Sequence, residues 1–159
     1  MDIKKTANLF INFTIRRITE IFGFIVFSAG TLILLALFTY SPEDPNFIFP
    51  DNTEIKNILG FQGSFVSDLL FQSLGLISYL FSFTLIVTGV NIIRSKDFLL
   101  VIENLFFVII YSILGTLFLT YFYSDAFNLY VNGNGGFVGK YLNETFLISL
   151  ILINETIFY

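Results

Sequence analysis

The amino-acid sequence predicts an all-α membrane protein: a polytopic helical bundle of four transmembrane helices, the fourth of them truncated or irregular, with a short outer amphipathic segment. Residues 21–40 contain no charge, and long apolar runs follow at 69–93 and 104–123. Hydrophobic residues make up 55% of the chain and charged residues 13%. Twenty helical residues rise about 30 Å, which matches the hydrocarbon core of a bilayer. In that layer only helices or closed barrels satisfy the backbone, and runs this long are helical.

The composition excludes several kinds of chemistry. Histidine and cysteine are both absent, which removes imidazole acid–base catalysis, thiol nucleophiles, disulfides and the usual zinc ligands. The formal net charge of −4 is small and spread over loops, so it indicates neither a nucleic-acid surface nor an acidic tail. We therefore predict no catalytic residue, no cofactor and no metal site, and we do not expect this chain to be an enzyme.

The first element is a basic lead-in over residues 1–20, followed by a membrane domain over 21–159. The lead-in mixes basic and apolar residues, as a partly amphipathic helix does. The first span, about 21–40, ends in bulky residues such as Leu37 and Phe38, where a cleaved signal peptide would need small ones. A signal anchor is therefore favoured over a cleaved signal. The basic residues of the lead-in are Lys4, Lys5, Arg16 and Arg17.

The distribution of basic residues predicts the orientation. Arg94 and Lys96 occupy the short turn after the second predicted span, so this turn and the lead-in should both face the cytoplasm. The segment 41–68 holds a single lysine against five acids and should lie outside. Tyrosines that suit the headgroup layer close the predicted outer ends of spans: Tyr40, Tyr121 and Tyr123.

The outer segment after the first span predicts two features. Ser41 and Pro42 suit the cap and first position of one short helical turn. Apolar residues spaced among polar ones over 58–69 then predict an amphipathic stretch near the membrane surface, with Gly60 and Gly63 allowing a bend. A simple solvated loop is the alternative. The second span should follow at about 69–93.

Small hydroxyl residues repeat at helical spacing on the second span and on the third, about 104–123. Such stripes let helices approach closely and are more typical of bundle packing than of a polar pathway. Glu103, near the cytoplasmic end of the third span, is expected to pair with Arg94 or Lys96. The predicted packing residues are Ser78, Ser82, Ser112, Gly115, Thr116 and Thr120.

The fourth span is predicted at about 137–159. Its most apolar part, 146–159, gives only about 21 Å of helix, so the span is either clipped or begins near Phe137, which would put Lys140 and Glu144 at the outer interface. The asparagine and glycine alternation at 132–136 predicts a flexible outer turn. Glu155 then approaches the cytoplasmic interface, while an intramembrane functional acid is the alternative.

The string at 40–45, Tyr-Ser-Pro-Glu-Asp-Pro, closes the first predicted span. It resembles the same place in the amino-terminal four-span membrane domain of the FtsK/SpoIIIE DNA translocases. The likeness is best over 32–96, although Asn46 and Phe47 stand where the family often has serine and tryptophan. The run 132–139 is similar to the family's glycine-rich approach to its fourth span. The residues that carry the resemblance are Tyr40, Ser41, Pro42, Asp44, Pro45, Gly60, Gly63, Asp68, Gly75, Tyr79 and Gly89.

The resemblance implies a membrane anchor of a septal DNA translocase, acting in cell division and chromosome segregation. It implies a multi-pass protein of the bacterial inner membrane at the division septum, a homo-hexamer that meets other division proteins. DNA would be contacted only by a cytoplasmic ATPase motor. The motor's phosphate loop, G-x-x-x-x-G-K-[ST], is missing here, and the single Gly-Lys pair is Gly139–Lys140 on the predicted outer side. We therefore expect no ATPase activity from these residues.

Other function classes remain open. A small transporter or channel subunit needs polar groups along a midplane path, and the first span offers only Ser28 and Thr31. A stand-alone membrane scaffold is a further alternative. A membrane-embedded enzyme has the least support, because the predicted spans hold no paired acids or other catalytic set.

Overall fold

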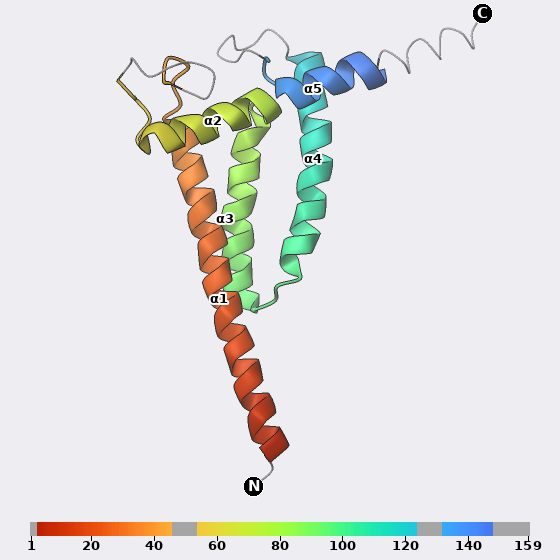
Figure 1. Ribbon diagram of the computed structural model, residues 1–159. Helices are drawn as coiled ribbons and strands as arrows, with labels where there is room; N and C mark the ends of the chain where they lie inside the picture. Colours follow the sequence, from red (N-terminus) through yellow and green to blue (C-terminus); the bar gives the residue numbers. More distant parts are fainter. Residues whose placement is uncertain (1–2, 46–53, 124–131, 148–159) are drawn as a thin grey trace, which may run out of the picture.

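The computed structural model describes residues 3–45, 54–123 and 132–147, and these ranges are helical with connecting turns. Three long helices run side by side, and two shorter ones lie across one common end (Figure 1). We call this the α2 end and the opposite one the basic end. The helices are α1 (Ile3–Phe38), α2 (Gly60–Leu74), α3 (Ile77–Ser95), α4 (Leu100–Phe122) and α5 (Gly136–Leu142), which continues into a π-helical turn, Asn143–Leu147.

Three helices are long and apolar enough to cross a membrane: Asn8–Phe38 within α1, all of α3 and all of α4. The all-helical membrane fold is therefore confirmed for the described residues. The predicted first span and lead-in form one unbroken helix, since no proline occurs between Ile3 and Phe38 to interrupt it. From Glu20 to Tyr40, α1 and its exit rise about 30 Å, one hydrocarbon thickness.

The second span was predicted at 69–93, and its start was wrong. Helix α2 continues across the α2 end as far as Leu74, and the crossing helix α3 begins only at Ile77 (Figure 1). The break falls at Gly75, whose φ of 58° is a left-handed conformation that glycine adopts without strain. Of the two glycines predicted to bend the chain, Gly60 begins α2 with φ 65°, whereas Gly63 lies inside the helix.

The fourth span, predicted at 137–159, is not found in the described residues. Helix α5 and its π-helical turn lie across the α2 end instead of returning alongside α4 (Figure 1). The reason is close packing: a Cβ at Gly139 would lie 2.4 Å from the carbonyl oxygen of Thr116 near the end of α4. Residues 148–159, with Glu155, lie outside the described residues.

The core of the bundle is the contact between α1 and α3. A Cβ at Gly89 on α3 would lie 2.4 Å from the backbone nitrogen of Phe27, and one at Gly30 on α1 would lie 2.8 Å from that of Ile86. The two backbones therefore touch, which is the arrangement that small residues permit between membrane helices. This contact fixes how the two helices cross and how far each can slide along the other.

Helix α4 is attached to α3 by two polar bridges within the span. Tyr111 Oη donates to Thr84 Oγ1 at 2.9 Å, and Asn104 Nδ2 donates to Thr88 Oγ1 at 2.8 Å. Hydropathy alone does not single out these residues, although each is polar within an apolar run. Much of the remaining surface of α4 is exposed and apolar, so it faces lipid or a partner in the membrane.

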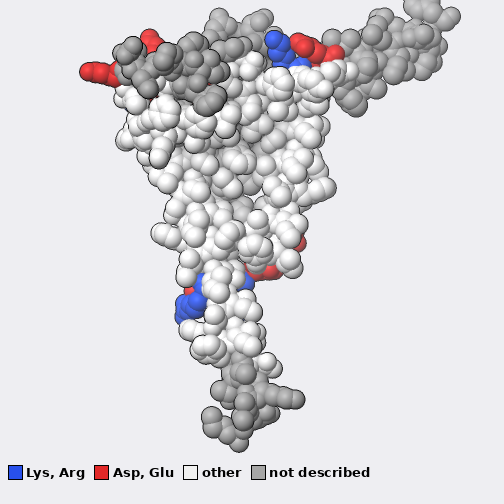
Figure 2. Space-filling model, in the orientation of Figure 1, with Lys and Arg blue, Asp and Glu red and all other residues white. Residues whose placement is uncertain are grey.

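Charged side chains gather at the two ends, with an uncharged band between them (Figure 2). At the basic end Glu20 on α1 pairs with Lys96 Nζ at 2.8 Å and with Arg17 Nη1 at 2.7 Å. The expected partner of Lys96 was Glu103, which forms no ion pair with the described residues. Helix α1 continues past the α3–α4 turn (Figure 1), and its Glu20 lies within ion-pair distance of Lys96 in that turn.

We expect Gly89→Ala to lower the free energy of unfolding by about 1–3 kcal/mol, because the added methyl group meets backbone that cannot move aside. Thermal unfolding in detergent micelles, followed by circular dichroism, measures this loss. Gly115→Ala on α4 is the matched control: its Cβ meets only the flexible end of Ile77, so the change should stay below about 1 kcal/mol. Equal effects of the two substitutions would contradict the proposed backbone contact.

Candidate functional site

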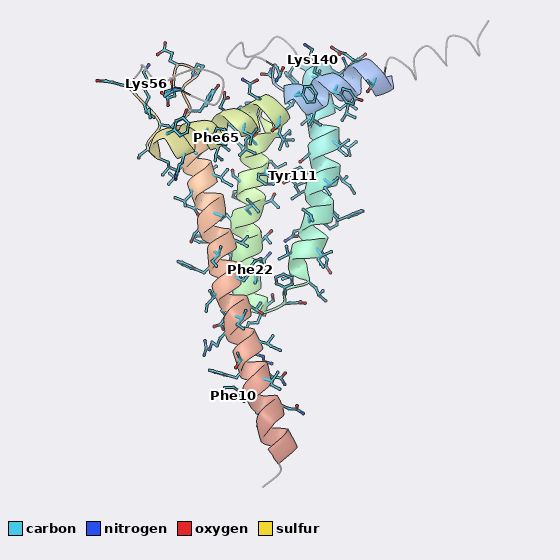
Figure 3. The ribbon with its side chains drawn as sticks, in the orientation of Figure 1. Phe10, Phe22, Lys56, Phe65, Tyr111 and Lys140 are labelled. Carbon is cyan, nitrogen blue, oxygen red and sulfur yellow. The ribbon has the colours of Figure 1, made fainter. Side chains whose placement is uncertain are left out.

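Polar residues of the sequence string 40–45 and of α2 form one cluster at the α2 end. We call this cluster the end cap; its members are Tyr40, Asp44, Asn57, Ser64 and Asp68. They come from the exit of α1, from the segment before α2 and from α2 itself. The cap closes the top of the α1–α3 pair, and Figure 3 shows Lys56 and Phe65 beside it.

Asp44 is the centre of the end cap. Its side chain is buried, with 3% of the residue exposed, and its two oxygens serve separate donors. Oδ1 accepts from the backbone N–H of Lys56 at 2.8 Å, and Oδ2 accepts from that of Asn57 at 2.9 Å. Charge-assisted hydrogen bonds of this kind are roughly twice as strong as neutral ones. One carboxylate thus ties the exit of α1 to two backbone N–H groups that lie twelve and thirteen residues further along the chain.

Asn57 connects this bridge to the end of α1. Its Nδ2 donates to the carbonyl of Ala36 at 2.9 Å, which satisfies one of the carbonyls that the last turn of a helix leaves without an intrahelical partner. Its Oδ1 accepts from the backbone N–H of Leu59 at 3.1 Å. A Cβ at Gly63 would lie only 2.1 Å from this oxygen, so glycine is required for α2 to lie this close.

An aromatic cluster lies directly beneath the end cap. Phe71 is fully buried between the rings of Tyr40 and Tyr79, with ring centroids 4.9 and 5.4 Å away. Tyr40 Oη donates to Asp68 Oδ1 at 3.2 Å, and Tyr79 Oη donates to the carbonyl of Leu37 at 3.3 Å. Each tyrosine therefore packs its ring against apolar residues and uses its hydroxyl to join two helices.

The rest of the string forms a hydrogen-bonded turn. The backbone N–H of Asp44 donates to the carbonyl of Ser41 at 3.2 Å, and Ser64 Oγ donates to that of Pro45 at 3.1 Å. Pro42 is exposed at its edge. The exposed ammonium of Lys56 pairs with Glu43, which lowers the pKa of that carboxyl and raises the pKa of Lys56.

The turn 132–136, predicted as a flexible outer turn, is held by hydrogen bonds on several sides. Asn134 is 1% exposed; its carbonyl accepts from Leu76 N–H at 2.9 Å, and its Nδ2 donates to the carbonyl of Tyr123. Asn132 Nδ2 donates to the carbonyl of Gln72 at 3.1 Å. A Cβ at Gly75 would lie 1.9 Å from the carbonyl oxygen of Asn134. The turn therefore ties the α2–α3 break to the end of α4.

The predicted packing residues lie between the helices. Ser78, Ser82 and Thr116 are fully buried and Ser112 nearly so, while Gly115 faces Ile77. Ser78 Oγ donates across to the carbonyl of Leu70 on α2 at 2.8 Å. The hydroxyls of Ser82, Thr116 and Thr120 donate to carbonyls of their own helices. Most of these hydroxyls are thus used locally.

The basic residues that predict the orientation in the membrane belong to α1 and to the turn between α3 and α4, at the basic end. Arg16, Arg17, Arg94 and Lys96 are exposed there, while Lys4 and Lys5 belong to α1 but their side chains lie outside the described residues. In the described part of the chain, no group of three or more His, Cys, Asp or Glu side chains could hold a metal ion. The end cap and the turn 132–136 therefore close the α2 end of the bundle.

A model of the 4TM region of DNA translocase FtsK/SpoIIIE matches residues 15–157. The chain belongs to this family. Among its relatives is the DNA translocase FtsK of Rhizobium meliloti, which is 28% identical over 66% of this chain and 12% of that protein. The FtsK of Caulobacter vibrioides is 37% identical over 47% of this chain and 9% of that protein. The FtsK of Rickettsia typhi is 25% identical over 84% of the chain and 18% of its own length. No solved structure matches.

The resemblance carried by the string 40–45 is thus confirmed at the level of the family. This FtsK-type membrane region spans less than a fifth of the length of the relatives named here. The match covers α1 from Ile15 onward, the end cap and all later helices, whereas the ATPase motor of the family lies outside it. The residues on which the resemblance was based gather at the end cap, at the Gly75 break and at the Gly89 contact.

We expect Asp44→Asn to lower the free energy of unfolding by about 2–3 kcal/mol, because one amide N–H would replace an acceptor that faces a buried backbone N–H. Ser64→Ala, which removes a single neutral hydrogen bond, should cost about 1 kcal/mol. Denaturant unfolding in micelles compares the two. An Asp44→Asn variant as stable as the parent chain would show that the carboxylate does not hold the cap.

Proposed function

We propose that this chain is the membrane anchor of a septal DNA translocase that acts in cell division and chromosome segregation. It would hold a cytoplasmic hexameric ATPase motor at the bacterial inner membrane while DNA passes between daughter compartments. The observation that carries the proposal is the match to the FtsK/SpoIIIE 4TM region over residues 15–157, together with three helices able to cross a membrane. DNA would be touched by the motor alone.

The proposed orientation has the amino terminus and the α3–α4 turn in the cytoplasm. The described part of that end carries Arg16, Arg17, Arg94 and Lys96 against Glu20, Asp97 and Glu103, and a larger number of Lys and Arg residues is the bias expected of cytoplasmic segments. The described part of the α2 end carries Glu43, Asp44, Glu54, Asp68 and Glu144 against Lys56 and Lys140. The end cap would then face the cell exterior, within reach of other division proteins.

A homo-oligomer, a hexamer by family resemblance, fits the surface of α4. This helix presents exposed apolar side chains on several faces, among them Phe106, Ile109 and Leu114. Neighbouring copies in a ring would cover some of that surface, and lipid would cover the rest. Close packing of this kind drives association of helices within the bilayer.

The transporter alternative receives no support from the described spans. Residues 21–38 of α1, 77–93 of α3 and 104–122 of α4 contain no Asp, Glu, Lys or Arg. Polar groups inside the bundle, such as Thr84 and Thr88, are used in bridges between helices. A path for ions or charged solutes normally needs ionisable residues near the midplane, so we favour an anchor.

The orientation is tested with single cysteines, since the chain has no native thiol. Ser95→Cys at the basic end and Glu54→Cys at the α2 end place thiols at exposed positions. In intact spheroplasts a membrane-impermeant maleimide should label the cysteine at 54, while the one at 95 should react only after permeabilisation. The reverse pattern would invert the topology.

The anchoring function is tested by fusing the chain to the linker and motor of an FtsK translocase in cells that lack their own FtsK membrane region. The fusion should sediment with membranes, gather at midcell and restore septation. Two controls are the motor alone and the motor on unrelated transmembrane helices. A fusion that stays soluble would refute the anchor, and one that reaches the membrane but never midcell would refute the septal role.

A further inference from the structure

We propose that a polar hollow at the α2 end binds the phosphate-bearing headgroup of a phospholipid. The hollow has a volume of about 420 Å³ and lies where the end of α4, the turn 132–136 and α5 meet. Its polar lining residues are Thr120, Tyr121, Asn132, Asn134, Lys140 and Asn143. It lies apart from the end cap, which is built on α1 and α2.

Lys140 gives the hollow its charge preference. It is the single charged residue in the lining, it is exposed, and it forms no ion pair within the described residues. Lys56, the other described lysine at this end, is paired with Glu43. Figure 3 places Lys140 on α5 above the end of α4. In Figure 2 a basic side chain at this place lies beside acidic ones. A phosphate bound there would accept from the ammonium of Lys140 and from the side-chain amide of Asn143, since the amide of Asn132 already donates twice to Gln72.

Asn134 supplies a second and independent feature. Its Nδ2 donates to the carbonyl of Tyr123, while its Oδ1 is buried and has no hydrogen-bond partner within the described residues. A buried acceptor left unpaired is costly, so a bound molecule that reaches this oxygen and donates to it would gain binding energy. A glycerol hydroxyl or an ammonium group carried next to a phosphate would provide one, and common phospholipid headgroups combine both groups.

The surroundings favour a lipid as the source of that phosphate. Phe118, Phe122 and Leu114 on α4 have exposed fractions of 51%, 64% and 61%, so an apolar surface extends from the hollow into the uncharged band. Phe137 and Tyr141 on α5 add exposed rings at its rim. A headgroup seated in the hollow could therefore leave its acyl chains along α4, at the depth where headgroups and chains of a bilayer meet.

The test is native mass spectrometry of the full chain, released from micelles with dioleoyl phosphatidylglycerol. We expect one tight lipid, with dioleoylglycerol, which lacks the phosphate, bound at least about tenfold more weakly. Lys140→Gln should weaken phosphatidylglycerol about fivefold, the effect of one charge-assisted bond at an exposed site. Lys56→Gln removes the same charge from the same end and should leave the affinity unchanged.

The hydrogen bond proposed from the headgroup to Asn134 Oδ1 is tested by changing the lipid and not the protein, since a substitution at this buried residue could disturb the fold. Dioleoyl phosphatidylmethanol has the same charge as phosphatidylglycerol but lacks hydroxyl donors, so it should bind about threefold more weakly. Equal binding of all three lipids, or an affinity unchanged by Lys140→Gln, would overturn the proposal. Inorganic phosphate that binds as tightly as the lipid would show a free-anion site and would overturn the assignment to phospholipid.

Discussion

The backbone contact between α1 and α3 is the interaction on which the rest of the structure depends. Lipid chains are as apolar as leucine, so membrane helices gain little from hydrophobic burial against each other and rely on close packing. Gly89 and Gly30 bring the two backbones together. This pair fixes the positions of the end of α1 and the start of α3, between which the end cap is built. Helix α4 then joins through its bridges to Thr84 and Thr88.

The ends of the bundle face a second constraint, because a helix that stops at the membrane surface leaves carbonyls without partners. The end cap meets this constraint with side chains rather than with further helix: Asn57 serves the end of α1, and Asp44 gathers the N–H groups of the segment that carries Asn57. On the other side the turn 132–136 does the same for Leu76 and Tyr123. Asp44, Gly63 and Gly75, which carried the resemblance in the sequence, therefore act in closing one end of the bundle.

Hydropathy predicted the helical class and the three apolar helices well, since each depends on the composition of about twenty neighbouring residues. It could not place the start of α3, because α2 is apolar enough to extend the same run from 69 onward. The alternation of asparagine and glycine predicted a flexible turn at 132–136, although these residues equally suit a turn that is hydrogen-bonded on several sides. The Tyr111 and Asn104 bridges were missed because their partners lie on another helix.

The sequence by itself determined that the chain belongs in a membrane, that thiol and imidazole chemistry are excluded, and, through the string 40–45, which family it joins. Only the tertiary structure decided that the chain turns at Gly75, that α5 lies across the end of α4, and that Lys96 pairs with Glu20. The physical reason is one of range. Apolarity is a property of each residue and adds up locally, whereas the direction of a helix at the membrane surface depends on atoms that distant segments bring to it.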